Sequence, residues 1–370
     1  MSERICEGRV CIVTGAGRGL GREHAKMLAA HGASVVVNDL GGSRDGRGAD
    51  AGPAEQVVVE IVAEGGHAVA NFDDVSDWAG AERLVGQAID AFGGLDVLVN
   101  NAGILRDRML VNMTADEWDA VIRVHLGGTF APARHAAAYW RERSKAGHTN
   151  DARIINTTSI SGLYANPGQS NYGAAKAGIA AFTQIAAQEL ARYGVTVNAV
   201  APGALTRMTD DTKMSDEIRA RYDPRWVAPV VTWLASGDSR DITGQVIESN
   251  GLVLAIAEGW HRGPSSPPPA EATEVGRAVR RLLETARPHT RMAETVCRGG
   301  VARTRGRRPP DRPGGRGEPS RSRGPAPAPR VARRGRVGIA AARPRHCGQG
   351  EVLVQRVRPG LDGGQPWSGG

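Results

Sequence analysis

The sequence predicts an α/β fold in which a single domain is built on a doubly wound parallel sheet. Short apolar runs rich in β-branched residues, at 10–13 and 34–39 for example, alternate with stretches of helical pattern, as in sheets that helices cover on both faces. A glycine-rich stretch at 14–21 separates the first run from an amphipathic segment. Polar or glycine-rich residues also follow other runs, at the strand ends where such sheets bind ligands.

The expected elements follow from this alternation in chain order. Strands are predicted at 10–13, 34–39, 67–72, 95–99, 154–158, 195–200 and 244–248, and helices at 20–31, 53–64, 77–92, 171–193 and 224–234. A helical hairpin is expected at about 114–146, a flexible glycine-rich loop at 41–52, and a mobile lid over the substrate at 204–222. The fold is expected to close near residue 260.

The glycine-rich stretch and the acid after the second strand predict a dinucleotide site. Gly15, Gly19 and Gly21 let the backbone turn tightly and approach a pyrophosphate at the N-terminus of the next helix. Asp39 stands 24 residues after Gly15, close to where an acid binds the adenosine ribose hydroxyls. An acid there repels a 2′-phosphate, which favours NAD over NADP. Arg18 argues weakly for NADP, because it could reach a 2′-phosphate.

Two further polar stretches end predicted strands. Asp73-Asp74-Val75 follows the third strand, where a carboxylate and a backbone N–H could meet the adenine edge. The alternative is an N-cap cluster for the helix that begins near Ser76. Asn100-Asn101-Ala102-Gly103 follows the fourth strand, so it is expected at the same edge of the sheet.

Ser159, Tyr172 and Lys176 place a hydroxyl, a phenol and an amine near the end of the fifth strand. Tyr172 and Lys176 are four residues apart, so on a helix both side chains lie on one face. An ammonium that close to a phenol is expected to lower the tyrosine pKa from about 10 toward neutrality. Such a tyrosine can give or take a proton at a carbinol or carbonyl oxygen.

The basic charge lies in the last part of the chain. The 370 residues carry a formal net charge of +8, but residues 293–370 hold 17 Arg, no Lys and 5 acidic residues, so residues 1–292 carry a net charge of −4. The charge is therefore no evidence that the folded part binds nucleic acid. We expect a folded domain at 1–263, a linker at 264–292 with a short amphipathic helix at about 274–286, and a disordered Arg/Gly/Pro-rich tail at 293–370.

The tail has two interpretations: it binds nucleic acid or acidic partners, or it is an extension without function. We favour the second, so nucleic acid is not expected among the partners. The four cysteines (Cys6, Cys11, Cys297 and Cys347) show neither metal-ligand spacing nor a pairing pattern. Reduced thiols, no metal and a cytoplasmic location are expected. The N-terminus has no signal-peptide pattern and no run of 18 apolar residues occurs, so no membrane contact is expected.

Five motifs in order give the chain a resemblance over about residues 5–262. They are Thr14-Gly15-x-x-x-Gly19-x-Gly21, Asn100-Asn101-Ala102-Gly103, Ser159, Tyr172-x-x-x-Lys176 and Pro202-Gly203. The chain resembles the short-chain dehydrogenase/reductase family, which implies a Rossmann-type fold and a nicotinamide cofactor. The resemblance implies that Tyr172 is the general acid/base, that Lys176 lowers its pKa and holds the nicotinamide ribose, and that Ser159 hydrogen-bonds the substrate oxygen.

The cofactor site follows from the residues and the resemblance together. Asn101 and Gly103 would line the adenosine side, Pro202-Gly203 the nicotinamide side, and Thr206 would contact the carboxamide or diphosphate. The expected set is Gly15, Arg18, Gly19, Leu20, Gly21, Asp39, Asp74, Val75, Asn101, Ala102, Gly103, Tyr172, Lys176, Pro202, Gly203 and Thr206.

One position departs from the family pattern. Where members of the family usually have an asparagine in the central helix, which acts mainly through its backbone carbonyl, this chain has His125. A histidine could keep that carbonyl and serve in the proton relay, or it could simply pack.

A narrower resemblance is carried by Asn38-Asp39-Leu40-Gly41-Gly42, by Val124-His125-Leu126 and by the stretches at 233–241 and 257–264. These are similar to the (3R)-hydroxyacyl-CoA dehydrogenase part of multifunctional β-oxidation enzymes and to its stand-alone bacterial relatives. The resemblance implies oxidation of a 3-hydroxyacyl thioester with NAD, and a homodimer or homotetramer. The alternatives are a steroid or other secondary-alcohol dehydrogenase, or an inactive cofactor-binding protein.

Overall fold

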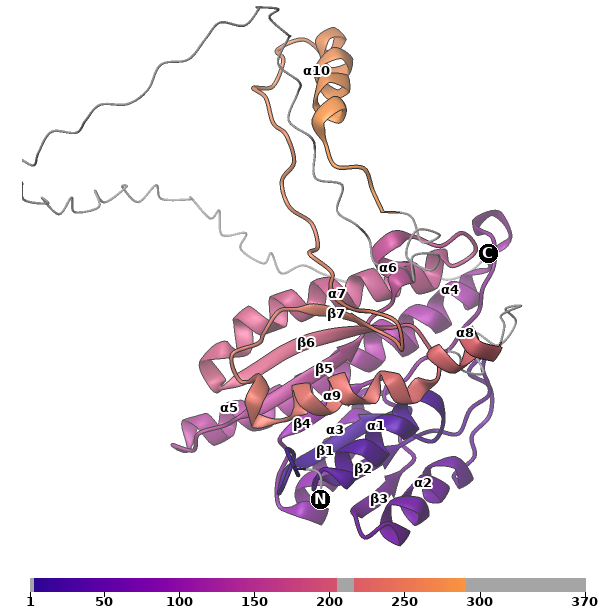
Figure 1. Cartoon of the computed structure of the whole chain (residues 1–370), viewed down its shortest axis with the longest axis vertical. Coiled ribbons are helices and arrows are strands. Elements are labelled where there is room, and N and C mark those ends of the chain that lie inside the picture. Colours follow the sequence, from indigo (N-terminus) through magenta and orange to yellow (C-terminus); the bar gives the residue numbers. More distant parts are fainter. Residues whose placement is uncertain (1–2, 205–215, 291–370) are drawn as a thin grey trace, which may run out of the picture. The chain divides into compact units, whose positions relative to one another are not determined.

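A central sheet organises the part of the chain that the structure describes. The computed structural model describes residues 3–204 and 216–290. Within these residues eight strands lie in the order β3-β2-β1-β4-β5-β6-β7-β8 (Figure 1). All neighbours pair in parallel except β7 and β8, which are antiparallel. The strands are β1 Val10–Thr14, β2 Ser34–Asn38, β3 His67–Asn71, β4 Val97–Asn100, β5 Ala152–Thr157, β6 Val195–Pro202, β7 Val246–Ser249 and β8 Leu254–Ile256. The predicted Rossmann-type doubly wound sheet is confirmed.

Helices cover both faces of this sheet. The helices of the described residues are α1 Gly19–Ala30, α2 Gly52–Ala63, α3 Trp78–Phe92, α4 Ala115–Ile122, α5 Gly128–Lys145, α6 Ile160–Tyr164, α7 Ser170–Leu190, α8 Asp216–Arg221, α9 Ala228–Ala235 and α10 Ala272–Thr285. Apolar residues of α1, α2 and α9 form a core with one face of the sheet. Those of α3, α5 and α7 form a core with the other.

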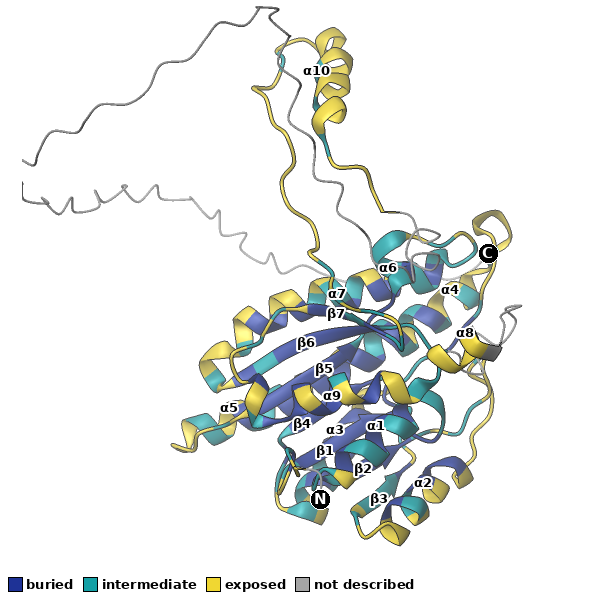
Figure 2. Ribbon diagram, viewed as in Figure 1, coloured by how far each residue is buried: buried dark blue, intermediate teal, exposed yellow. Residues whose placement is uncertain are grey.

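The central strands β1, β2 and β4 are largely apolar because both of their faces are buried. Within β1, Val13 packs toward α1 and α9, while Ile12 packs toward α3 and α5. Both residues are fully buried, and the strands accordingly form the buried centre of the ribbon in Figure 2. Trp140 on α5 adds a polar anchor, since its indole N–H donates to the Leu95 carbonyl at 2.7 Å.

The helical hairpin predicted at 114–146 is wrong. A π-helical segment, Arg123–Gly127, follows α4 directly, and α5 follows that segment directly. The adjacent Gly127 and Gly128 resemble a turn signal, yet both keep right-handed helical angles. One helical run therefore replaces the hairpin, with a π turn at the centre.

Smaller differences arise where the sequence carries weak signals. The short helix α6 and the edge strand β8 were not predicted, and the helix predicted at 224–234 is a 3₁₀ turn, Pro224–Trp226, followed by α9. The loop expected to be flexible at 41–52 contains its own hydrogen bonds, such as that from Ser43 N to Arg47 O at 2.8 Å. In the expected linker, the predicted helix is present as α10.

Several predictions fall on residues that the structure does not describe. Thr206, residues 205–215 of the predicted lid and the tail from 293 onward lie outside the described residues. The domain boundary at 263 stays a prediction. No helix in the described part is both long and apolar enough to cross a bilayer. Residues 3–204 and 216–290 also contain no group of three or more side chains that could hold a metal ion.

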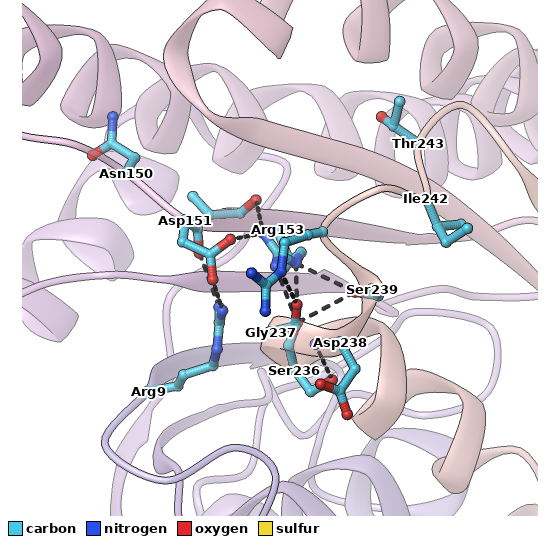
Figure 3. A network of polar contacts seen from close by, with 12 residues as sticks. Arg9, Asn150, Asp151, Arg153, Ser236, Gly237, Asp238, Ser239, Ile242 and Thr243 are labelled. Atoms are coloured by element: carbon cyan, nitrogen blue, oxygen red, sulfur yellow. Dashed lines mark hydrogen bonds and ion pairs between the residues drawn. The ribbon is translucent and has the colours of Figure 1, made fainter.

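A buried arginine links β5 to α9 at the amino ends of the strands (Figure 3). Arg153 on β5 is 1% exposed, and its Nε and Nη2 donate to the Ser236 carbonyl, which follows the last turn of α9. Its Nη1 lies 2.7 Å from the Asp151 carboxylate, which also pairs with Arg9. The cation therefore caps a helix C-terminus, where carbonyl oxygens lack partners.

Candidate active site

A cavity of about 260 Å³ lies at the carboxyl ends of the central strands. Most of the predicted cofactor residues meet on its wall: Gly15, Arg18, Gly19, Leu20, Asp39, Asp74, Val75, Asn101, Ala102, Gly103, Tyr172, Lys176 and Pro202. Gly21, Gly203 and Ser159 do not line it. Strand ends far apart in the sequence thus contribute to one site, as expected for a doubly wound sheet.

The glycine-rich loop is fixed to the loop after β4. A Cβ on Gly15, whose φ is +63°, would lie 2.7 Å from the Ala102 Cα. The Thr14 hydroxyl accepts from the backbone N–H groups of Asn101 and Ala102 at 2.9 and 3.1 Å. The Asn101 amide in turn donates to the Thr14 and Gly15 carbonyls. Asn101 therefore shapes the loop as well as lining the cavity.

The N-terminus of α1 opens on this loop without a side-chain cap. Arg18 stands at the N-cap position and makes no capping hydrogen bond, and the first turn carries no acidic residue. Gly21 lies off the cavity wall, but a Cβ there would lie 2.2 Å from the Gly15 carbonyl oxygen, so α1 approaches the loop closely only because residue 21 is glycine. The uncapped backbone amides at this helix end suit an anion such as a pyrophosphate.

The carboxylate of Asp39 is held in place on the cavity wall. One of its oxygens accepts from Gly17 N and the other from Gly41 N, both at 2.7 Å. Arg18 lines the same cavity. The wall thus carries both the acid expected to select NAD and the arginine that argued for NADP.

Asp74 serves the loop after β3 and the cavity together. Its Oδ1 accepts from the backbone N–H and the hydroxyl of Ser76 at 2.8 and 2.6 Å, while Oδ2 lies 3.4 Å from Arg123. The N-cap of α3 is Asp77, which accepts from Gly80 N. The alternative, in which residues 73–75 cap a helix that begins near Ser76, is therefore wrong, because α3 begins at Trp78 and its N-cap is Asp77. Asp74 and Val75 lie on the cavity wall.

Ser159, Tyr172 and Lys176 come together at the ends of β5 and α7. Ser159 is the N-cap of α6 and is 8% exposed. Tyr172 and Lys176 lie one turn apart on α7, and the Lys176 Nζ is 5.6 Å from the centre of the Tyr172 ring. The same Nζ donates to the Thr157 carbonyl at 2.5 Å. The three groups needed for proton transfer at a substrate oxygen are thus adjacent.

The pKa of Tyr172 shifts in the direction opposite to the prediction. Burial raises the pKa of Tyr172 to about 12; a hydrogen bond with Ser159 opposes this rise, and the negative charge of Asp107 adds to it. Burial also lowers the pKa of Lys176 to about 7. Desolvation penalises the charged form of each group and here outweighs the attraction between them. The spacing in the sequence showed that the pair is close but not how deeply it is buried.

Asn171 supports the tyrosine and was missed by the sequence reasoning. Its side chain is fully buried and donates to the carbonyls of Arg106 and Glu117 at 3.0 and 3.1 Å, while its Oδ1 accepts from Tyr172 N at 2.7 Å. The N-terminus of α7 is thereby tied to α4 and to the loop after β4. A polar residue next to the tyrosine was the only available signal.

His125 lies in the π-helical segment with its ring buried against the tyrosine. The rings of His125 and Tyr172 are 5.1 Å apart and nearly perpendicular, at 85°. The Nε2 atom of His125 lies 2.8 Å from the oxygen and 3.1 Å from the nitrogen of Ile104. The sequence allowed two interpretations, service in a proton relay or simple packing. The ring packs against Tyr172, and it also makes polar contacts with Ile104.

The cavity wall also includes residues outside the predicted site set. They come mainly from the loop after β2 and from the π-helical segment, and they are Asn38, Leu40, Gly42, Ser43, Arg44, Gly46, Asp73, Ile104, Arg123, Val124, His125 and Thr157. The narrower resemblance named the stretches 38–42 and 124–126 without assigning them to the cofactor site, and the glycine-rich composition of the loop was the signal for Ser43, Arg44 and Gly46.

Known proteins match most of the described part of the chain. The family model for short chain dehydrogenases matches residues 9–222. The hydroxyacyl-CoA dehydrogenase ChsB1 of Mycobacterium tuberculosis is 47% identical over 265 residues, which are 69% of this chain and 81% of that protein. The peroxisomal multifunctional enzyme type 2 of Mus musculus is 43% identical over 254 residues, which are 69% of this chain but only 32% of the enzyme. This chain therefore spans about a third of that relative.

Solved structures agree with these matches. A short chain dehydrogenase from Mycobacterium avium is 51% identical with a TM-score of 0.71, over 78% of this chain and 98% of that one. A short chain dehydrogenase from Burkholderia cenocepacia, solved in complex with NADP, is 33% identical with a TM-score of 0.58, over 67% of this chain and 98% of that one.

Proposed function

Because the chain belongs to the short-chain dehydrogenase family, we propose that it transfers a hydride between a secondary alcohol or ketone and NAD, with Tyr172 as general acid/base. The observation that carries this proposal is the single cavity that has Asp39 and the glycine loop on its wall together with Tyr172 and Lys176. Dinucleotide recognition and proton transfer thus share one space.

The geometry supports a simple division of roles. In the reducing direction Tyr172, which keeps its proton at neutral pH, donates it to the substrate carbonyl oxygen. A reduced dinucleotide held in this cavity would supply the hydride for the carbonyl carbon. The Ser159 hydroxyl donates a hydrogen bond to the same oxygen and stabilises its growing negative charge. The pKa of Lys176 is near 7, so its protonated form is accessible and stabilises the tyrosinate. Oxidation reverses these steps.

We propose a 3-hydroxyacyl thioester as substrate, oxidised to the 3-oxo form. Support comes from the similarity to a hydroxyacyl-CoA dehydrogenase and to a multifunctional peroxisomal enzyme. A steroid or another secondary alcohol is the alternative substrate within the family, and an inactive cofactor-binding protein is the alternative outside catalysis. NAD is preferred in this proposal because the Asp39 carboxylate stands on the cavity wall; Arg18 and the NADP complex of the Burkholderia protein favour NADP.

Absorbance of the reduced nicotinamide tests the proposal. The protein is assayed with NAD and with NADP against 3-hydroxyacyl-CoAs of either configuration, steroids and simple alcohols. We expect the highest kcat/KM with NAD and a (3R)-hydroxyacyl-CoA, and a loss of at least about 100-fold in Tyr172→Phe. Turnover confined to steroids or simple alcohols would refute the thioester assignment. Binding of NAD without turnover on any alcohol would favour the inactive alternative.

A further inference from the structure

The imidazole of His125 lies between the loop after β4 and the catalytic tyrosine. It is 1% exposed and packs edge-on against the Tyr172 ring. A Cβ on Gly103 would lie 2.3 Å from the His125 Cε1 atom, so the ring fits only because residue 103 has no side chain. The ring also forms part of the cavity wall. This placement brings it into contact with two functional parts of the site.

A neutral ring can make only one of its two contacts with Ile104 as a hydrogen bond. Burial, aided by the positive charge of Lys176, lowers the pKa of His125 to about 3, so the ring carries one proton. Nε2 either donates to the Ile104 oxygen at 2.8 Å or accepts from the Ile104 nitrogen at 3.1 Å. Among the described residues Nδ1 has no hydrogen-bond partner. The shorter contact favours the ring with its proton on Nε2.

Ile104 in turn packs against the loop that follows β2. A Cβ on Gly46 would lie 3.0 Å from the Ile104 side chain, so the two residues touch. Next to this contact, Leu105 N donates to the Arg44 carbonyl at 3.0 Å. Gly42, Ser43, Arg44 and Gly46 line the cavity. The turn at 103–105 is therefore the support for one side of the dinucleotide cavity.

We propose that His125 is a positioning residue, whose Nε2 holds the turn at 103–105, and with it the loop at 42–46, in the geometry that binds the dinucleotide. The same ring fixes the orientation of the Tyr172 phenol by edge-on packing. The inference rests on the proposed dinucleotide-dependent function. In this proposal His125 contributes to dinucleotide binding through its side chain, by the contact of Nε2 with Ile104.

Substitution of His125 by two amide residues distinguishes the contribution of Nε2 from that of Nδ1. The amide of His125→Gln reaches about as far as Nε2 and can still donate to the Ile104 oxygen, whereas that of His125→Asn reaches only about as far as Nδ1. We expect NAD to bind about tenfold more weakly to His125→Asn, as for the loss of a buried hydrogen bond, and nearly normally to His125→Gln. Without cofactor, the Leu105 amide should exchange its hydrogen faster in His125→Asn than in His125→Gln. Equal binding and equal exchange in the two variants would refute the proposal.

A measurement on the unchanged protein covers the case in which a variant does not fold. ¹⁵N NMR of the histidine rings at pH 7 should show His125 neutral, with a slowly exchanging proton on Nε2. A rapidly exchanging proton on Nε2, or a proton on Nδ1 together with a rapidly exchanging Ile104 amide, would overturn the inference. These readouts need no substrate, so an enzyme without activity on 3-hydroxyacyl-CoA would refute the thioester assignment and leave this test intact.

Discussion

Lys176, which is buried, and Tyr172, which is half-buried, lie on one face of α7, and desolvation there favours the neutral form of each. Among the residues that the structure describes, the Lys176 Nζ has one oxygen partner, the Thr157 carbonyl, and the residue is 3% exposed. Burying an ammonium costs stability unless an anion compensates for the lost hydration. The proposed function would thus require a lysine without which the fold would be more stable.

Lys176→Met is expected to stabilise the protein and abolish turnover. The pKa of Lys176 is about 7 in the folded protein and about 10.5 in an unfolded chain. Between these values the unfolded chain binds more protons, so folding stability falls as pH drops from about 10.5 to about 7. The variant lacks this loss, and its gain in Tm over the unchanged protein should be larger at pH 7 than at pH 10. Lys145→Met, at an exposed site on α5, is the control, and a gain that does not depend on pH would contradict the argument.

Asp39→Asn is expected to reduce the preference for NAD. The substitution keeps an oxygen for one of the two backbone N–H groups at Gly17 and Gly41 but removes the charge that repels a 2′-phosphate. We expect kcat/KM with NADP relative to NAD to rise by about tenfold or more. Asp45→Asn is the matched control, because Asp45 lies in the loop after β2 but off the cavity wall. An unchanged cofactor ratio would remove Asp39 from the specificity argument.

Elements are joined by polar contacts at both ends of the sheet, and the two ends have different tasks. At the carboxyl ends the Thr14 and Asn101 contacts shape the cavity. At the amino ends Arg153 joins β5 to α9 (Figure 3), and burial lowers its pKa although Asp151 opposes the shift. The contacts of Arg153 are therefore expected to affect the free energy of unfolding without changing the rate of the reaction.

Arg153→Met should test this separation. It removes the donors to the Ser236 carbonyl and the ion pair with Asp151, so we expect the free energy of unfolding to fall by about 2 kcal/mol. The measurement is urea unfolding together with steady-state kinetics at a temperature where the variant is folded. Arg141→Met, an exposed ion-pair residue on α5, should change stability little. A fall in kcat without a loss of stability would show that the two ends are coupled.

The sequence predicted most elements because their patterns are local. Each parallel strand from β1 to β7 was expected, since residues such as Ile12 and Val13 are buried on opposite faces of the sheet and so form an apolar run. The π turn was not expected, because Gly127 and Gly128 favour a non-helical turn locally. The packing of α5 on the sheet keeps them helical. In β8, Leu254 and Ile256 are largely exposed, which leaves no pattern of burial to detect.

At the scale of the whole molecule, the cavity combines local and distant contributions. The glycine loop, Asp39, Tyr172 and Lys176 were predictable because backbone turns and proton transfer demand these residue types at set spacings. The wall formed by residues 42–46 could not be predicted from the sequence. It depends on the contact of Gly46 with Ile104, which joins two loops across the end of β1 and has no local signature in the sequence.

Self-association belongs to this scale as well, and we propose a homodimer or homotetramer. Phe130 on α5 is 47% exposed and its ring lies 6.3 Å from that of Phe182 on α7, where Ile185 is also 56% exposed. Exposed apolar side chains on adjacent helices suit a contact between two copies. Light scattering should show a dimer or tetramer, and Phe130→Glu should shift it toward monomer. Val59→Glu on α2, 61% exposed on the other face of the sheet, should leave the mass unchanged; a monomeric native protein would refute the proposal.

The π turn at Arg123–Gly127 is a place where the helical run can lose one residue. A π turn holds about one residue more per turn than an α-helix, and each residue of an α-helix rotates the next by about 100°. Removing a single residue here would let the run close as a continuous α-helix. Because the π turn absorbs the extra residue, α5 would keep nearly the same orientation relative to α4, and Trp140 would stay in the core. A single-residue gap at this position in an otherwise similar protein would therefore mark the loss of the π turn, with the packing of the central helix preserved.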